Sequence, residues 1–464
     1  MKDTVLRVLL AAGALLVSGC ATNREALRAF NASFEQGRYE AADDVAGHRI
    51  NKKNPHKALL WNLQGGTTRL LLGDFAGSVT LYDQAEAAFK FYDLDSTAEN
   101  AVQLGAALAL NDSFAPYQGE EYDRIMVNSY KGLCFAALGD YENARVEFNR
   151  ALQRQEEAKH HFARQIKKTK TELAKQDSLA NRQAVDGTGA PFSVTDTLES
   201  DSFKDAMRET YSNLDTFQAY PDFINPFATY LAGLFFLLEG DTGKASGILK
   251  ESFGMDPDHP VVRADFADAE AGRAPKGQCW VIFENGLCVE RVEFRLDIPI
   301  FLVTRELKMV NVAFPVLSTR GRAVDSLSIS TATETARTIA ICDMDRVIRT
   351  EFKKDLTMII GREVARQAAK TYLQYMVQRE YGDLGGIIMA VFQTFSTAAD
   401  TRSWTALPSD IQVARFPISP DRRLTVSDGG RLSIPVQLPA CDNAIVHVRL
   451  PQVGVPAAVS IIKF

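Results

Sequence analysis

The sequence predicts an α+β multidomain protein, in which an N-terminal stack of paired helices precedes a C-terminal α+β domain with short strands and a helical insert. Three observations predict this fold class. A short pattern around a glycine recurs four times in the first 275 residues. After that point the apolar runs become short and Pro and Gly frequent, which is typical of strands and turns. A chain of 464 residues is also too long for one ordinary domain, and its 46% hydrophobic and 24% charged residues fit a globular protein.

The chain starts with MKDTVLRVLLAAGALLVSGC, which has the layout of a secretory signal. Lys2 and Arg7 supply positive charge, an apolar stretch follows, and small residues precede Cys20. The ending VSGC resembles the lipobox of bacterial lipoproteins, in which the cysteine thiol is acylated. We therefore expect residues 1–19 to be a lipoprotein signal peptide and Cys20 to be a lipidated N-terminus, held at a membrane by its acyl chains. A plain secreted signal with a coincidental cysteine is the alternative.

The residue after Cys20 indicates where the mature protein is sent. It is Ala21, and in Gram-negative sorting a residue other than Asp at this place implies the outer membrane. We expect the protein on the periplasmic side of that membrane. No other apolar run reaches 18 residues, so no second membrane segment is expected. The formal net charge of −6 does not attract a polyanion, so no nucleic-acid partner is expected either.

Four glycines in the first half stand in similar surroundings: QGRYEAA around Gly37, LGDFAGS around Gly73, LGDYENA around Gly139 and EGDTGKA around Gly240. Their spacings of 36, 66 and 101 residues are close to one, two and three units of the 34-residue tetratricopeptide repeat, whose positions they resemble. The resemblance implies a tetratricopeptide-like helical solenoid over residues 20–275. An irregular helical bundle with chance matches is the alternative.

The offsets within a repeat have a mechanical reason. A small residue such as Gly132 lets two antiparallel helices approach, and a large one such as Phe148 fills the space beside it. The glycine after the first helix can take the left-handed conformation that ends it. One hairpin buries too little apolar surface alone, so hairpins stack into a curved array with a concave face. Residues of about 155–202 interrupt this array, and their polar composition predicts a protruding helix and a loop, either a docking arm or a solvated face.

Residues 276–464 predict the α+β domain. Trp280–Phe283 and Val289–Leu296 are short β-rich runs, and Asn285-Gly286 between them predicts a hairpin turn. From Met344 to Glu380 the apolar period is helical. Five more short runs follow Pro408: Ile411–Phe416, Leu424–Val426, Leu432–Val436, Ile445–Leu450 and Val459–Ile462. We therefore expect a small sheet or sandwich with a helical insert.

Four strings carry a wider resemblance: DSFAPYQGEEYDRIMVNSYKGL from Asp112, ARVEF from Ala144, VIFENG from Val281 and DTRSWTALPSDIQVARF from Asp400. They resemble an uncharacterised family of bacterial lipoproteins that contain tetratricopeptide repeats. The resemblance implies an outer-membrane lipoprotein, and because some relatives are encoded beside a lipoprotein activator of penicillin-binding proteins, it hints at a role in cell-envelope assembly. The family has no established catalytic residues, so none is carried over.

Motifs that would indicate an enzyme or a metalloprotein are missing. The sequence has no HExxH, no paired CxxC and no GxSxG, so we expect no catalytic residues, no metal and no cofactor. Five cysteines remain after lipidation: Cys134, Cys279, Cys288, Cys342 and Cys441. Cys134 is expected to be buried and apolar. Bridges between Cys279 and Cys288 or between Cys342 and Cys441 stay open, because sequence gives no geometry.

Two segments combine aromatic and charged residues in a way that suits a binding surface. The first contains Asp112, Pro116, Tyr117 and Tyr122, together with Glu120, Glu121 and Arg124. Tyrosine offers a rigid face with a polar tip, which is favoured at interfaces, although aromatic residues that pack the repeats would look the same. The second contains Arg402 and Trp404. Arg402 can meet a partner's carboxylate or pair with Asp400, and Trp404 can meet a partner or fill the junction between the two halves.

These observations lead to two main hypotheses of different classes, and an accessory for lipid or polysaccharide export is a third. The first is a non-catalytic, membrane-anchored scaffold that binds other envelope proteins. The alternative is a protein that binds or processes peptidoglycan or another polysaccharide, using carboxylates and the rings of Trp280 or Trp404 against sugars. The sequence names neither the partner nor the oligomeric state.

Overall fold

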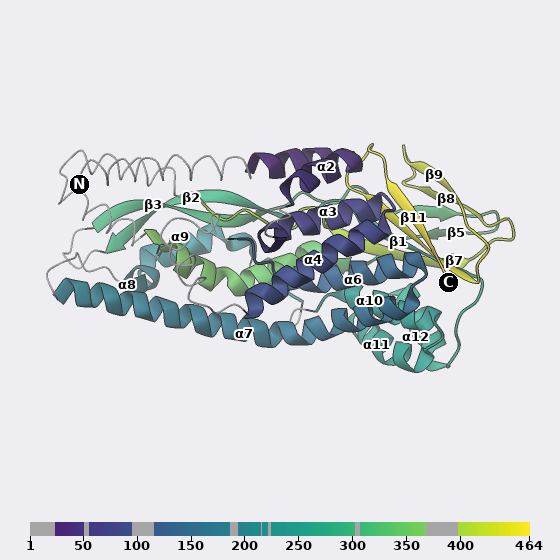
Figure 1. Cartoon of the computed structure of the whole chain (residues 1–464), viewed down its shortest axis with the longest axis horizontal. Coiled ribbons are helices and arrows are strands. Elements are labelled where there is room, and N and C mark those ends of the chain that lie inside the picture. The colour runs from purple at the N-terminus through teal and green to yellow at the C-terminus, as the bar shows by residue number, and fades with distance from the viewer. Residues whose placement is uncertain are drawn as a thin grey trace.

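The computed structural model describes residues 24–50, 55–94, 116–185, 194–214, 216–220, 224–301, 307–364, 366–367 and 398–464. Helices form the body of the first half, and most of the strands gather at one end of the long axis, near the C-terminus (Figure 1). The ribbon of strands β2 and β3 lies toward the other end. Signal-peptide residues 1–19, Cys20 and Asp112 lie outside the described residues.

Among the described residues of the first half, four helix pairs each contain one of the predicted glycine turns. The pairs are a helix over residues 24–35 with α2 (Tyr39–Arg49), α3 (Leu59–Leu71) with α4 (Phe75–Leu94), α6 (Glu121–Leu138) with α7 (Tyr141–Val185), and α10 (Pro226–Leu238) with α11 (Thr242–Met255). A short 3₁₀ helix, η1 (Pro55–Ala58), precedes α3, and α12 (Pro260–Glu270) follows the last pair. Consecutive pairs contact each other through α2 and α3, α4 and α6, and α7 and α10, while α11 contacts α12.

The glycine of each pair adopts the left-handed conformation, as predicted. The φ angles are 68° at Gly37, 79° at Gly73, 77° at Gly139 and 83° at Gly240. In the third pair, Gly139 N donates to Ala136 O at 3.0 Å and Asp140 N donates to Phe135 O at 2.9 Å, which satisfies carbonyls that the helix end leaves open. The residue after the turn glycine is aspartate in three copies, and its side chain accepts a backbone N–H of the next helix: Gly77 for Asp74, Asn143 for Asp140 and Lys244 for Asp241.

The predicted close approach of the paired helices is also confirmed. A Cβ atom added at Gly132 would lie 2.7 Å from the ring of Phe148. The equivalent atom at Gly66 would lie 2.5 Å from Tyr82, and at Gly233 it would lie 2.7 Å from Leu249. Each of the three pairs therefore has a glycine on its first helix at the point where a large side chain of the second helix packs against it.

The long polar segment continues the third pair. α7 is a single helix from Tyr141 to Val185, so the predicted protruding helix begins as the second helix of a repeat (Figure 1). After residues 186–193, which lie outside the description, α8 (Val194–Glu199), α9 (Asp201–Thr210) and the 3₁₀ helix η3 (Ser212–Leu214) lead the chain back. α8 and α9 contact β2. Phe203 and Met207 of α9 are buried, which gives this short helix one apolar face.

Within its described residues, the C-terminal half forms three sheets. A five-stranded sheet has the order β11-β10-β1-β7-β6, a four-stranded sheet the order β5-β4-β8-β9, and β2 and β3 form a two-stranded ribbon. The strands are β1 (Gln278–Asn285), β2 (Glu290–Phe301), β3 (Leu307–Ser318), β4 (Ser328–Ser330), β5 (Thr335–Arg337), β6 (Ile339–Asp343), β7 (Asp410–Pro417), β8 (Arg423–Ser427), β9 (Ser433–Gln437), β10 (Asn443–Leu450) and β11 (Ala458–Lys463). The predicted strands after Pro408 are confirmed as β7 to β11. The predicted helical insert is a helix over residues 344–364, and residues 368–397 lie outside the description.

Strand β1 lies in the middle of the five-stranded sheet and is buried on both faces. Trp280 and Ile282 pack in the core that includes the helices. The alternate residues Val281 and Phe283 pack in a second core with the four-stranded sheet. Because side chains of a strand point alternately to opposite faces, β1 separates a layer of helices from a layer of strands. This double burial explains why the run has no polar positions from Cys279 to Phe283.

One prediction for this region is wrong. Asn285-Gly286 does not join β1 and β2 into a hairpin: β1 pairs with β10 in parallel and with β7 in antiparallel register, and β2 pairs with β3. The Asn285 side chain instead accepts the backbone N–H groups of Ala323 and Val324 at 3.1 and 3.2 Å. Gly286, at φ 67°, lies against the backbone of Gly321. Both edges of β1 are taken by distant strands, so the chain leaves the sheet at this turn.

The largest core is continuous across residue 275. Trp404 is fully buried, its ring lies 5.9 Å from that of Tyr82 and 5.8 Å from that of Tyr130, and its indole N–H donates to Thr67 at 3.0 Å. Strand β11 contacts α3 and α6, and β6 contacts α10. The first helices α3, α6 and α10 are consequently buried along almost their whole length. They offer little surface to a partner, because the chain's own C-terminal half covers them. The domain boundary near residue 275 stays a prediction.

Among the residues that the structure describes, no helix combines the length and the apolar character needed to cross a membrane.

Candidate functional site

The first predicted segment leads into the N-terminus of α6. Glu120 is the N-cap, and a capping box forms there: the Glu120 side chain accepts the N–H of Asp123, and Asp123 Oδ2 accepts the N–H of Glu120 at 2.9 Å. The Tyr117 hydroxyl donates to the same Asp123 oxygen at 2.6 Å. These bonds satisfy amides that a helix start leaves open, and they hold the Glu120 side chain beside the helix end.

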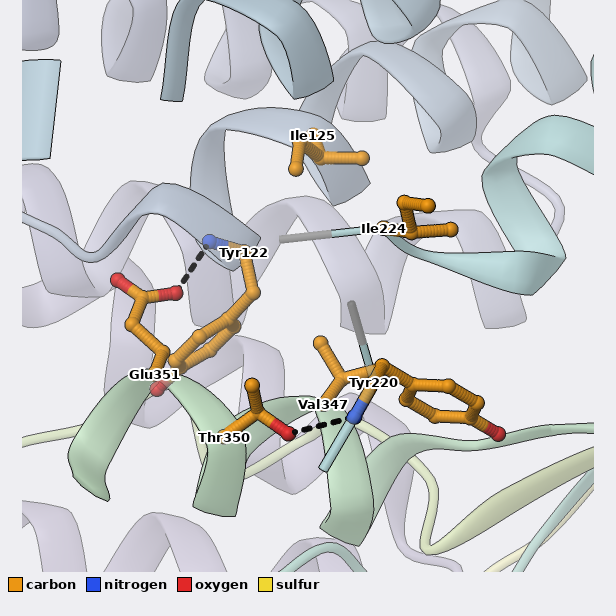
Figure 2. Close-up of a pocket in the computed structure, with 7 residues that line it drawn as sticks. All are labelled: Tyr122, Ile125, Tyr220, Ile224, Val347, Thr350 and Glu351. Carbon is orange, nitrogen blue, oxygen red and sulfur yellow. Dashed lines mark hydrogen bonds between the residues drawn. The ribbon is translucent and has the colours of Figure 1, made fainter. Parts of the chain in front are cut away.

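A second carboxylate reaches this helix end from far along the sequence. Glu351, on the helix over residues 344–364, accepts the N–H of Glu121 at 2.6 Å and the N–H of Tyr122 at 3.0 Å. Figure 2 shows the Glu351 carboxylate directed toward the Tyr122 backbone nitrogen. A helix N-terminus carries partial positive charge, so an anionic group is favoured there. Glu351 joins the helical half of the chain to the C-terminal half.

Asp355 adds a third carboxylate one turn further along the same helix. Oxygen atoms of Glu120, Glu351 and Asp355 all lie within 4.8 Å of one another. Asp355 is 9% exposed, and its Oδ1 atom has no hydrogen-bond partner among the described residues. We call Glu120, Glu351 and Asp355 the carboxylate cluster.

Two arginines act on the carboxylate cluster: Arg291 pairs with Glu120, and the charge of Arg362 lowers the pKa of Asp355. Arg291 of β2 forms an ion pair with Glu120 at 2.6 Å, and the two side chains are 10% and 15% exposed. Its guanidinium also lies 5.5 Å from the centre of the Phe352 ring. Arg291 can neutralise Glu120 and Arg362 partly offsets Asp355, so three carboxylates share two cations in a site with little solvent.

Burial and mutual repulsion make ionisation of this cluster unfavourable. Burial, followed by the charges of Glu120 and Asp355, raises the pKa of Glu351 well above its usual range. Burial and the charge of Glu120 likewise raise the pKa of Asp355 to about 8, although Arg291 opposes the shift. Burial raises the pKa of Asp123 to about 7 against the hydrogen bond from Tyr117. Carboxylates with such pKa values take up a proton or a cation readily.

The second predicted segment lies close to the first. Arg402 donates two hydrogen bonds to Asp400, at 2.8 and 2.7 Å, and its guanidinium lies 5.9 Å from the centre of the Tyr117 ring. Burial would raise the pKa of Asp400, but the charge of Arg402 and its hydrogen bonds outweigh burial and lower this pKa to about 2. The structure therefore brings Tyr117 and Arg402 together, and Arg402 pairs with Asp400 within the chain.

A small pocket adjoins Glu351. Its lining residues come from α6, the helix over residues 344–364 and the segment before α10: Tyr122, Ile125, Tyr220, Ile224, Val347, Thr350 and Glu351 (Figure 2). The cavity volume is about 10 Å³. That is room for about one water molecule, and it is far below the several hundred Å³ typical of sites for organic ligands. This pocket does not hold a sugar ring.

The six predicted partner-binding residues differ in their surroundings. Asp112 lies outside the described residues, Pro116 is half-buried, and Tyr117 and Tyr122 are 7% and 2% exposed. Trp404 is fully buried in the core that joins the two halves. The prediction that Trp404 contacts a partner is therefore corrected. Its ring has no accessible surface and packs in the core instead. The same holds for sugar stacking by Trp280, which is also fully buried.

Three residues of this site were not predicted from the sequence: Glu351, Asp355 and Arg291. Glu351 and Asp355 stand on a helix that we recognised by its apolar period alone, and Arg291 stands on a strand assigned to the wrong hairpin. The one available signal was a pair of carboxylates four residues apart on the helix that also carries Val347 and Phe352. Such pairs are common on solvated helix faces, so the pattern did not single them out.

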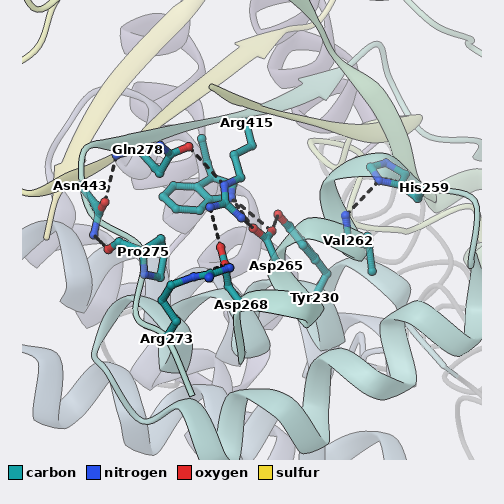
Figure 3. Close-up of polar contacts among 11 residues, drawn as sticks. Tyr230, His259, Val262, Asp265, Asp268, Arg273, Pro275, Gln278, Arg415 and Asn443 are labelled. Carbon is teal, nitrogen blue, oxygen red and sulfur yellow. Dashed lines mark hydrogen bonds and ion pairs between the residues drawn. The ribbon is translucent and has the colours of Figure 1, made fainter. Parts of the chain in front are cut away.

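A second charged cluster ties α12 to the five-stranded sheet (Figure 3). Arg415 of β7 forms ion pairs with Asp265 at 2.8 Å and with Asp268 at 2.7 Å. Asp265 also accepts the hydroxyl of Tyr230 at 2.7 Å and the indole N–H of Trp280 at 3.2 Å. Because these donors occupy both Asp265 oxygens, we assign this cluster a structural role.

The five described cysteines, Cys134, Cys279, Cys288, Cys342 and Cys441, carry free thiols. Neither of the bridges left open by the sequence is formed in this structure. Cys134 is buried, as expected, and burial raises the pKa of its thiol to about 12, which disfavours the reactive thiolate.

The observed architecture is a helical N-terminal region of paired helices followed by a C-terminal region of sheets. No protein-family model matches the chain, and no curated protein matches it. Among solved structures, it is similar to a tetratricopeptide repeat protein from Parabacteroides merdae, at 11% identity over 53% of this chain and 98% of that chain, with a TM-score of 0.13.

Proposed function

We propose that this protein is a non-catalytic scaffold for protein–protein interactions, anchored to the outer membrane through Cys20 and active in cell-envelope assembly or maintenance. The observation that carries the proposal is the recurrence of one helix-pair design in four copies. Each copy has a left-handed glycine turn, and three have a glycine at the helix crossing, which are the features expected of tetratricopeptide-like repeats. Arrays of this kind present long surfaces that suit protein partners.

The second helices of the pairs supply the surface for such a partner. The first helices α3, α6 and α10 are buried beneath the C-terminal half. By contrast, Val146 of α7 is 43% exposed, and Leu138, at the turn between α6 and α7, is 51% exposed. Leu72, at the equivalent turn between α3 and α4, is 38% exposed. We place the partner along the outer helices and these turns.

The proposed anchor would keep this body close to the membrane. The described part of the chain begins at residue 24, four residues after Cys20, and four residues span at most about 14 Å. Acyl chains on the cysteine would gain about 0.8 kcal/mol for each CH₂ group buried in the leaflet. The predicted lipobox supports this part of the proposal.

Photo-crosslinking in cells tests the scaffold. A photoreactive amino acid at Val146 should crosslink to a defined envelope protein, which mass spectrometry then identifies. The matched control is Val453, which is 59% exposed in the turn before β11 and should give no such product. Absence of any product from Val146, Leu138 and Leu72 across growth conditions would contradict the scaffold.

The anchor is tested separately by mass spectrometry of the mature N-terminus. We expect acyl chains on Cys20 and release of a Cys20→Ala variant from the membrane fraction. An unmodified N-terminus would exclude the anchor without affecting the scaffold.

A further inference from the structure

If all three were ionised, the carboxylates of the cluster would hold more negative charge than the described cations beside them, Arg291 and Arg362, balance. Three carboxylates have oxygens within 4.8 Å of one another, and Arg291 pairs with one of them. Two backbone N–H groups of α6 support Glu351. Among described residues, no hydrogen-bond donor reaches Asp355 Oδ1. An anion in low dielectric without a partner is unfavourable.

Asp355 is the second observation that points to a ligand. Its side chain is nine-tenths buried, and it stands one helical turn after Glu351 on the same helix, so both carboxylates lie on one face. Glu120 approaches from the end of another helix, where the capping box fixes it. Oxygens from two separate elements therefore converge on one small volume, with Asp355 Oδ1 still available.

The donor set defines the class of ligand. The three residues offer carboxylate oxygens, and neither histidine nor cysteine belongs to the group. Hard cations such as Ca²⁺ and Mg²⁺ bind oxygen, whereas zinc sites use nitrogen and sulfur. Ca²⁺ tolerates irregular geometry and mono- or bidentate carboxylates, while Mg²⁺ needs a near-ideal octahedron. The carboxylates of Glu351 and Glu120 already accept backbone hydrogen bonds. The site can therefore offer only an irregular set of ligand oxygens, which suits Ca²⁺ better than Mg²⁺.

We propose that Glu120, Glu351 and Asp355 form a binding site for a divalent cation, with Ca²⁺ as the preferred ion. The bound ion would join the start of α6 to the helix over residues 344–364. It would also lie near β2, whose Arg291 pairs with Glu120. It would therefore fasten the helical half of the chain to the C-terminal half at a place well away in sequence from the Trp404 contact. The role is structural, and it is independent of which partner the protein binds.

Calcium titration of the mature protein after treatment with EDTA tests the site. If the dissociation constant is on the order of 10⁻⁴ M, as in many extracellular calcium modules, 5 mM CaCl₂ should raise Tm by roughly 2–4 °C. Asp355→Asn should abolish the rise, and the exposed control Asp258→Asn should keep it. An equal rise in Asp355→Asn and wild type would overturn the proposal, as would no rise in wild type.

Terbium luminescence provides a measurement that does not depend on a variant. Tb³⁺ occupies calcium sites, and nearby tyrosines such as Tyr117 and Tyr122 sensitise its emission. We expect tyrosine-sensitised emission from the wild-type protein, loss of that emission on adding Ca²⁺, and much weaker competition by Mg²⁺. If NaCl at matched ionic strength removes the emission as effectively as CaCl₂ does, Tb³⁺ is held only in a diffuse ion atmosphere. That result would overturn the proposal.

Discussion

Asp400 and Arg402 show how two residues of one short segment can define a local charge balance. They stand two positions apart and form two short hydrogen bonds, with side chains 22% and 17% exposed. The pKa of Asp400 is lowered to about 2 in the folded chain from an ordinary value of 3.8, so the unfolded chain binds more protons between these pH values. The pair therefore contributes stability above about pH 4, and this stability is lost as pH falls toward 2.

Asp400→Asn should lower the free energy of unfolding by up to about 2 kcal/mol at neutral pH, because a pKa shift of one unit corresponds to 1.36 kcal/mol. The difference from wild type should stay constant above about pH 5 and shrink as the pH falls from about 4 to about 2. Urea unfolding at several pH values measures it, with Asp258→Asn as the control. A difference that does not change with pH would show that the ion pair is not its source.

Predictions for single residues succeeded where the interacting residues lie close together in the sequence. Pairing of Arg402 with Asp400 was one of two readings, because the two side chains are close in sequence whatever the fold. Trp404 was expected either at a surface or at the junction between the two halves. Packing against Tyr82 and Tyr130 places it at the junction. Glu351 was not predicted, because its role depends on contact with amides about 230 residues away.

At the scale of elements, the helix pairs follow from sequence more directly than the strands do. A glycine turn and a glycine at the helix crossing need few neighbours, and their spacing is visible along the chain. The pairing of β1 was not visible, because its partners β7 and β10 lie more than 120 residues away. A local turn signal at Asn285-Gly286 therefore predicted the wrong neighbour.

Gly132→Ala should destabilise the protein by about 1–3 kcal/mol, since the added Cβ would overlap the ring of Phe148. The matched control is Gly247→Ala on α11, where the new Cβ would have no atom within 4 Å apart from those of its chain neighbours and the backbone of its own helix. That change should stabilise the protein by about 0.5–1 kcal/mol, because Ala has the higher helix propensity. Chemical denaturation of both variants provides the comparison. Equal effects of the two changes would contradict the proposed close packing.

For the whole molecule, the decisive feature is the core shared by the helices and the five-stranded sheet. Trp404→Ala should cost about 3–5 kcal/mol, because it removes a large, fully buried ring from that core. Trp404→Phe should cost less than Trp404→Ala, because a ring still fills most of the space. Its remaining cost includes loss of the hydrogen bond to Thr67. Thermal unfolding of the two variants checks this order. A negligible effect of Trp404→Ala would place the ring outside the core.

Unfolding of the mature chain, followed by two probes, tests whether the paired helices and the C-terminal half form one folded unit. Far-UV circular dichroism reports the helices, and fluorescence reports the three tryptophans, Trp61, Trp280 and Trp404, all of which lie in the shared core. If the C-terminal half covers the first helices as one folded unit, both signals should change at the same midpoint. A helical signal that persists after the tryptophan transition is complete would contradict the account, because it would leave the paired helices folded with their inner surface uncovered.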